Sequence, residues 1–136
     1  MTALAADRNT PAIAGTRRQF NVLAATKIFA GALVMIDANG RAAKGATATA
    51  KKGVGRAAAL ADNSAGANDA ITVDVDVGIF RYANSSAGDA ITKADIGATC
   101  YIVDDQTVAK TDGTGTRSPA GTVFDVDALG VWVKFA

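Results

Sequence analysis

Every acidic residue in this 136-residue chain is Asp, and Glu is absent. Glu is one of the straight-chain residues that surface helices prefer, whereas Asp competes with the helix backbone for hydrogen bonds. The chain also has 14 Gly residues and many Thr and Val residues, which favour turns and strands. We therefore expect an all-β fold with short strands and tight turns.

The length and the side-chain volumes limit the chain to one domain with a thin core. Hydrophobic residues make up 49% of the sequence, but 31 of them are Ala and only 36 are larger. Residues 1–19 show no sustained hydrophobic period and offer only Leu4 and Ile13 as bulky anchors. We predict an extended N-terminal arm at 1–19 and a single domain at 20–136, built as a small β-barrel or a β-tulip-like domain.

Short apolar runs separated by turn residues predict the strands of this domain. In the run 71–82, the odd positions up to 79 are Ile or Val, and the even positions up to 76 are Thr or Asp, as in a strand with one buried face. Past Gly78, Phe80 and Tyr82 occupy the second face, so either both faces are covered there or the strand bends. Further strands are expected at 20–24, 27–36, 54–60, 99–105, 107–111, 121–126 and 130–135, with a hairpin turn at Asn39-Gly40 and a loop or weak edge strand within 41–53.

The tetrapeptide DAIT occurs at 69–72 and again twenty positions later, but the two copies lead into different structures. The first copy enters the alternating strand. The second precedes a stretch in which Thr92 and Asp95 stand three apart, as in a capping box with a shortened acid, and Gly97 can end the helix. We predict one short helix near 92–97 and no internal repeat, because the flanking sequences disagree.

Charge is divided unevenly along the chain. Residues 1–56 carry nine Lys or Arg and two Asp, a net +7, whereas residues 57–136 carry five Lys or Arg and eleven Asp, a net −6. The cations are dispersed, with few aromatic residues between them, so we expect no nucleic-acid partner. A basic arm that meets an acidic surface on a neighbouring copy or a larger partner fits better.

No segment is expected to direct the chain to a membrane. Asp7 and Arg8 precede any apolar run, so we expect no signal peptide. The apolar run 28–36 spans nine residues and contains Gly31, far below the roughly 20 residues that a spanning helix needs. We expect the chain to stay in the cytoplasm of the cell that makes it.

The residue types argue against catalysis. The chain has no His, which removes His-based acid–base relays, Ser-His-Asp triads and most zinc sites. The Gly-rich segment 111–121 lacks the Lys-Ser or Lys-Thr end of a phosphate loop. We predict that the protein is not an enzyme and uses no cofactor.

Two further features have an ordinary structural interpretation. Asp74 and Asp76 share one strand face and could hold a cation, but calcium loops place their acids on a tight turn. We expect a solvated sheet face instead and predict no metal site. Cys100 is the only cysteine, and we expect it to be a small buried hydrophobic residue rather than a reactive thiol.

Three stretches together resemble the capsid cement, or head decoration, proteins of tailed bacteriophages and prophages, including Mu-like ones. They are ADRNTP at 6–11, DIGATCYIVDDQTVAKTDGTGTRSPAGTV at 95–123 and GVWVKF at 130–135. The resemblance spans most of the chain, and the Ala-rich residues 41–59 match least. It implies a β-barrel-like module that sits on the outer surface of the assembled shell, as a homotrimer or alternatively a dimer, and locks neighbouring major capsid subunits together.

On this resemblance, the protein belongs on the virion after synthesis in the host bacterial cytoplasm, and its partner is the major capsid protein. We expect the interface on the arm and the start of the basic half, at Asp7, Arg8, Asn9, Thr10, Pro11, Arg17 and Arg18. Two alternatives stay open. One is another phage structural component, such as a head fibre or tail protein, and the other is a small β protein that binds a carbohydrate or nucleotide.

Overall fold

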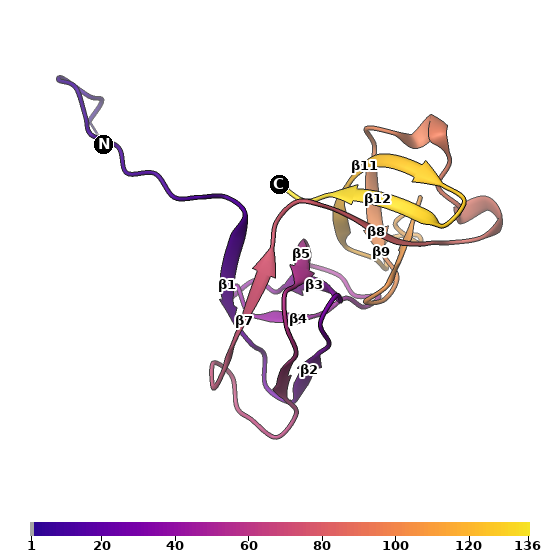
Figure 1. The fold of residues 1–136 in the computed structure, drawn as a ribbon, viewed down its shortest axis with the longest axis horizontal. Helices are drawn as coiled ribbons and strands as arrows, with labels where there is room; N and C mark the ends of the chain where they lie inside the picture. The colour runs from indigo at the N-terminus through magenta and orange to yellow at the C-terminus, as the bar shows by residue number, and fades with distance from the viewer. Residues whose placement is uncertain (1) are drawn as a thin grey trace.

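The computed structural model describes residues 2–136 as a two-part β structure from which the N-terminal segment projects (Figure 1). Within these residues the strands are β1 (Arg17–Asn21), β2 (Thr26–Ile28), β3 (Leu33–Ile36), β4 (Ala42–Lys44), β5 (Lys52–Ala57), β6 (Ala61–Asn63), β7 (Thr72–Asp76), β8 (Ile79–Asn84), β9 (Thr99–Ile102), β10 (Thr107–Ala109), β11 (Pro119–Asp127) and β12 (Gly130–Lys134). Two single-turn 3₁₀ helices, η1 (Ala87–Asp89) and η2 (Lys93–Asp95), lie between β8 and β9. The predicted all-β fold with a barrel is confirmed.

The strands up to β7 form an open five-stranded sheet and a separate two-stranded sheet, and the strands from β8 onward form a closed barrel. The open sheet has the order β1-β7-β5-β3-β4, and β2 pairs with β6 in a separate two-stranded sheet. The barrel closes in the order β10-β8-β12-β11-β9, with β10 parallel to β8. In Figure 1 the barrel, orange to yellow, lies at the upper right, and the open sheet, indigo to magenta, lies below it.

Two hydrophobic cores lie on the two faces of β3. Leu33 and Met35 belong to the barrel core, whereas Val34 belongs to the core between the open sheet and the β2–β6 pair. Because successive strand residues face opposite sides, β3 is buried on both faces. Cys100 is fully buried in the barrel core, which confirms the prediction made for it.

The run 71–82 forms two strands in different sheets, so it is not one continuous strand. β7 lies in the open sheet and β8 lies in the barrel. Two hydrogen bonds fix the crossing: the Val77 N–H donates to the Thr16 carbonyl at 2.9 Å, and the Phe135 N–H donates to the Gly78 carbonyl at 2.9 Å. The bend that the sequence allows past Gly78 is therefore the point where the chain changes sheets.

Other predicted strands are present with shifted ends. The run 27–36 is interrupted at Gly31, whose φ of +85° favours glycine, and so gives β2 and β3. Within 41–53, β4 is an edge strand, as one of the two predicted alternatives has it. The run 54–60 is shorter than expected, because β5 ends at Ala57, and β6 is a strand that the sequence does not predict.

The Asn39-Gly40 hairpin turn is confirmed between β3 and β4. Gly40 has a φ of +75°. This left-handed backbone conformation, which glycine adopts easily, is common in the turns of β-hairpins. The Asp37 carboxylate accepts hydrogen bonds from the N–H groups of Asn39 at 2.8 Å and Arg41 at 3.0 Å. The backbone of the turn is therefore held by a side chain that immediately follows β3.

The short helix near 92–97 is confirmed as one 3₁₀ turn, η2. The Thr92 N–H donates to Asp95 Oδ2 at 2.8 Å, which is the acidic half of the capping box that the spacing predicts. Gly97 follows with a φ of +91°. The shortened acid is long enough here because it reaches back over a single tight turn.

The alternation along β7 leads to a prediction about stability. Val75 is fully buried and Asp74 lies on the opposite face, where Gln19 Nε2 donates to its carboxylate at 3.1 Å. We expect Val75→Asp to reduce the free energy of unfolding by at least about 4 kcal/mol, because it buries an unpaired charge. Asp74→Asn should change it by less than about 1 kcal/mol, because the amide oxygen can still accept from Gln19.

Urea denaturation of both variants, followed by far-ultraviolet circular dichroism, measures these differences. A large loss of stability in Asp74→Asn would contradict the interpretation of this face as a solvated sheet surface and would restore the cation-site alternative.

Candidate partner interface

Residues 2–16 form an extended segment that makes almost no contact with the rest of the protein. All are exposed, and the two bulky side chains, Leu4 and Ile13, are 73% and 93% exposed. Among the described residues, the first backbone hydrogen bond along the segment is the one that the Thr16 carbonyl accepts from Val77. Figure 1 shows the segment leading away from both sheets. Apolar side chains left in solvent on an extended chain are available to a partner.

Five of the seven predicted interface residues lie on this segment. Asp7, Arg8, Asn9, Thr10 and Pro11 are consecutive and exposed. Within residues 2–136, neither Asp7 nor Arg8 forms an ion pair. The structure therefore places these five together but away from the folded body.

The other two predicted residues, Arg17 and Arg18, begin β1, which is an edge strand. The predicted arm extends to residue 19, whereas the strand starts at Arg17 and pairs with β7 from Arg17↔Asp76 to Asn21↔Thr72. β1 is the first strand in the order of the open sheet, so its other edge has no neighbouring strand. An edge of this kind offers unpaired N–H and C=O groups to another chain.

Arg17 and Arg18 point to opposite faces of the sheet and have different surroundings. Arg17 Nε donates to Asp76 Oδ1 at 2.9 Å, and Asp76 Oδ2 accepts from Arg56 Nη2 at 3.2 Å. These hydrogen bonds, that of Arg17 first, lower the pKa of Asp76 below its ordinary value. Arg18 instead places its guanidinium 4.8 Å from the centre of the Phe20 ring and has no ion pair within residues 2–136. Arg18 is therefore the arginine with charge left for a partner.

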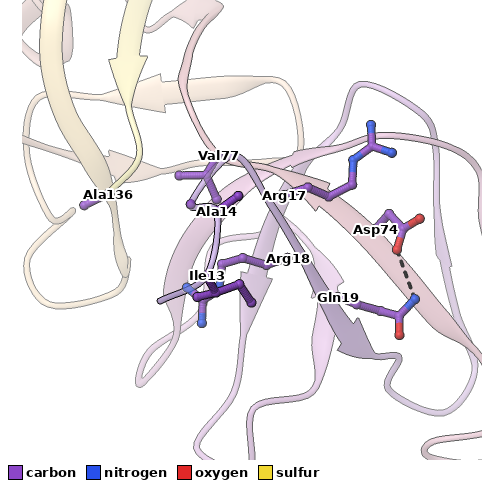
Figure 2. A pocket seen from close by; sticks show the side chains of 9 residues that line it. Ile13, Ala14, Arg17, Arg18, Gln19, Asp74, Val77 and Ala136 are labelled. Carbon is purple, nitrogen blue, oxygen red and sulfur yellow. Dashed lines mark hydrogen bonds between the residues drawn. The ribbon is translucent and has the colours of Figure 1, made fainter. Parts of the chain in front are cut away.

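A cleft of about 660 Å³ lies where the arm joins the sheet. Its lining residues are Ile13, Ala14, Gly15, Arg17, Arg18, Gln19, Asp74, Val77 and Ala136. Figure 2 shows Ala14 beside Val77 and Ile13 beside Arg18, with the Gln19–Asp74 hydrogen bond on the far side of β1. The lining of the cleft therefore combines apolar residues with the Arg18 side chain.

Sequence reasoning missed the apolar part of this surface. Ile13 is notable in the sequence only as a bulky residue in a stretch without a core period. Val77 belongs to the alternating run and is expected in the core, yet it is only partly buried because the chain leaves the open sheet there. Neither residue type nor spacing reveals that both residues line one cleft.

The uneven charge of the sequence is partly neutralised inside the folded chain. Four of the nine cations in residues 1–56 form ion pairs with Asp residues of the second half: Arg17 and Arg56 with Asp76, Lys27 with Asp62, and Arg41 with Asp69. The bipolar charge is therefore weaker in the fold than the sequence indicates. Within residues 2–136, the cations of the basic half that form no such pair are Arg8, Arg18, Lys44, Lys51 and Lys52.

The remaining chemistry of the surface is limited. The Asp74 carboxylate accepts a hydrogen bond from Gln19, and the Asp76 carboxylate accepts hydrogen bonds from Arg17 and Arg56. The two acids therefore belong to a hydrogen-bonded sheet face. Over residues 2–136, no three Cys or Asp side chains converge in a way that could hold a metal ion. The same part of the chain has no helix with the length and apolar character to cross a membrane. Burial raises the pKa of Cys100 to about 11, which keeps its thiol protonated at neutral pH.

Comparisons with protein-family models, with curated proteins and with solved structures found no match. The resemblance carried by 6–11, 95–123 and 130–135 therefore stays a prediction. The exposed arm, the open edge of β1 and the apolar cleft are the observations on which a function must rest.

The ion pairs of Asp76 lead to a prediction about acid stability. Its pKa is lowered in the folded state, so its contribution to stability is present above about pH 4, the ordinary Asp range, and is lost as the pH falls through the folded-state pKa. We expect Asp76→Asn to be less stable than the wild type at neutral pH and to converge with it in acid. Urea denaturation of both proteins across this range measures the difference.

Asp112→Asn is the matched control, because within residues 2–136 the Asp112 side chain is exposed and unpaired. This variant should follow the wild type at every pH. A gap between Asp76→Asn and the wild type that persists unchanged in acid would show that the loss has another origin.

Proposed function

We propose that the protein is a bacteriophage capsid decoration protein, which binds the outer surface of the assembled capsid and stabilises contacts between major capsid subunits. The observation that supports this most is the arm, fully exposed from residue 2 to 16 and continuous with the edge strand β1. A monomer gains nothing from an extended segment that buries none of its own apolar residues. A partner that buries Leu4 and Ile13 would stabilise the bound segment, because the transfer of apolar side chains out of water is favourable.

The dimensions of the arm suit a clamp between subunits. Fifteen extended residues span about 50 Å at most, which is enough to reach across a neighbouring protein. Ordering such a segment costs conformational entropy, so the docked arm must gain apolar burial and backbone hydrogen bonds from its partner. The open edge of β1 and the apolar cleft offer both at the root of the arm.

Repetition compensates for a small interface on each copy. A shell presents many identical sites, so modest contacts accumulate when copies also bind one another. In this proposal the partners are the major capsid protein and the protein itself, as a homotrimer or a dimer, and the location is the virion surface after synthesis in the host cytoplasm.

The stretches that carry the resemblance fall on two parts of the structure. ADRNTP lies on the projecting arm, whereas the block 95–123 covers β9, β10 and the start of β11, and GVWVKF covers β12. The stretches that suggest the family therefore fall on the arm and on the barrel. The weakly matching residues 41–59 fall on β4 and β5 of the open sheet.

Deletion of residues 2–15 tests the role of the arm. We expect the truncated protein to keep its fold, with an unfolding free energy within about 1 kcal/mol of the wild type, because these residues contribute nothing to either core. Its affinity for expanded, undecorated capsids should fall at least about tenfold. Co-sedimentation with capsids measures binding, and equal binding by the truncated and full-length proteins would refute the proposal for the arm.

The role of charge is tested by the salt dependence of attachment. Raising the salt from about 0.05 to about 0.5 M shortens the Debye length from roughly 14 to roughly 4 Å. We expect a slower association rate with a much smaller change in the dissociation rate, because screening acts mainly on the approach of the partners. The double variant Arg17→Asp/Arg18→Asp should show a shallower salt dependence, and Arg18→Asp alone should account for most of it.

Attachment kinetics on immobilised capsids at several salt concentrations measure both effects. Lys134→Asp is the control, since Lys134 is exposed on β12 and lies outside the arm and its cleft. Association that does not depend on salt would mean that shape and apolar burial alone hold the protein on the shell.

A further inference from the structure

A second cleft, of about 440 Å³, lies where the open sheet meets the barrel and has no part in the arm interface. It is lined by Gly31, Arg56, Ile79, Phe80, Arg81, Tyr82 and Trp132. These residues come from the turn between β2 and β3, from β5, and from the neighbouring barrel strands β8 and β12. Two guanidinium groups therefore meet four apolar or aromatic side chains in one cleft.

Arg56 is held in place from two directions. Its Cζ lies 4.1 Å from the centre of the Phe80 ring, and its Nη2 donates to Asp76 Oδ2 at 3.2 Å. Asp76 is shared with Arg17, so one carboxylate serves two guanidinium groups. The side chain of Arg56 stays 44% exposed. This arrangement leaves positive charge and free donors on a fixed side chain.

Arg81 is fixed in a similar way on the other wall. Its Cζ lies 5.3 Å from the centre of the Trp132 ring. Its Nη1 is 3.6 Å from Asp127 Oδ2, too long for a hydrogen bond, and that oxygen instead accepts from Trp132 Nε1 at 2.9 Å. The N–H donors of Arg81 are therefore not engaged by its ion-pair partner. A planar guanidinium with free donors is suited to bind a carboxylate with two hydrogen bonds.

The remaining walls are apolar or aromatic. Ile79 and Phe80 are partly buried, and Trp132 is likewise only partly covered. Tyr82 donates from its hydroxyl to the Gly31 carbonyl at 3.4 Å, and burial raises its pKa, so this hydroxyl stays protonated. A ligand in the cleft therefore meets two fixed cations and the aromatic rings that these cations partly cover.

We infer that this cleft binds an acidic sugar of the hexuronate class, with its carboxylate on Arg56 and Arg81 and its ring beside Trp132. The volume exceeds what a lone inorganic anion needs and falls within the range of small-molecule pockets, roughly 300–1,000 Å³. A ring with an apolar face and one carboxylate matches the combination of indole, phenyl and guanidinium groups. The inference is independent of the capsid proposal, because none of the residues that line this cleft lies on the arm or lines the cleft beside it. The one link between the two clefts is Asp76, which pairs with both Arg17 and Arg56.

Trp132 is the only tryptophan in the chain, so its fluorescence reports directly on the cleft. Titration of the full-length protein with sodium glucuronate should change the emission saturably, with a Kd on the order of 1 mM for a ligand of this size. Glucose, which lacks the carboxylate, should give no saturable change. Sodium sulfate at the same ionic strength should bind at least about tenfold more weakly, because it cannot use the apolar walls.

Arg81→Gln and Arg56→Gln should each weaken glucuronate binding at least about tenfold, as expected when a charge-assisted hydrogen bond is lost. Arg81→Lys keeps the charge without the planar fork and should give an intermediate loss. Lys27→Gln is the matched control, because Lys27 also lies over an aromatic ring, 5.1 Å from the Phe29 centroid, and pairs with an Asp, yet lies outside the cleft. Circular dichroism checks that each variant is folded.

Several results would overturn the inference. One is the absence of any change in Trp132 emission and in backbone amide chemical shifts up to about 20-fold above the expected Kd. Equal binding of glucose or of sulfate would show that the cleft does not recognise a sugar carboxylate. A loss in Lys27→Gln as large as in Arg81→Gln would show a non-specific charge effect. Arg81→Gln should still attach to capsids like the wild type, so failure here leaves the capsid proposal to its own tests.

Discussion

The fold depends on β3, because this four-residue strand separates the two hydrophobic cores. Leu33 and Met35 complete the barrel core while Val34 completes the core of the open sheet. The backbone of Leu33 also joins the two parts, since its N–H donates to the Asp105 carbonyl at 2.8 Å and its carbonyl accepts from the Gly45 N–H at 2.7 Å. Neither core can open without exposing a strand that belongs to both, so the two parts should unfold together.

Small residues make this junction possible. A Cβ at Gly53 would overlap the Ala120 carbonyl, and a Cβ at Gly45 would lie 2.8 Å from the Asp104 carbonyl oxygen. A buried hydroxyl also bridges the junction: Ser118 is 1% exposed and donates to the Ala48 carbonyl at 2.6 Å. The abundance of Ala and Gly thus reflects close approach of two backbones, and it explains how few large side chains can still close two cores.

Local patterns in the sequence predict local structure well here. Alternation identifies the buried face of β7, Asn39-Gly40 identifies a hairpin, and the spacing of Thr92 and Asp95 identifies a helical turn. The sequence does not predict which strands pair, because pairing such as β1 with β7 joins residues 59 positions apart. For the same reason it predicts Arg17 and Arg18 as interface residues without showing that Arg17 is paired with Asp76. The Arg81–Trp132 pair depends on a barrel register that no local pattern encodes.

The pairing of β1 with β7 also has a mechanical consequence. The arm leaves the folded body at the N-terminal end of β1, and β1 pairs with β7 over five residue pairs. Ladder hydrogen bonds of an antiparallel pair lie perpendicular to the strands. A pull along β1 therefore loads the whole ladder in shear, together with the Arg17–Asp76 pair at its end, instead of opening the bonds one at a time. Tension on the arm is therefore transmitted to β7, the neighbour of β1 in the open sheet. β1 separates from β7 only when all five residue pairs break together.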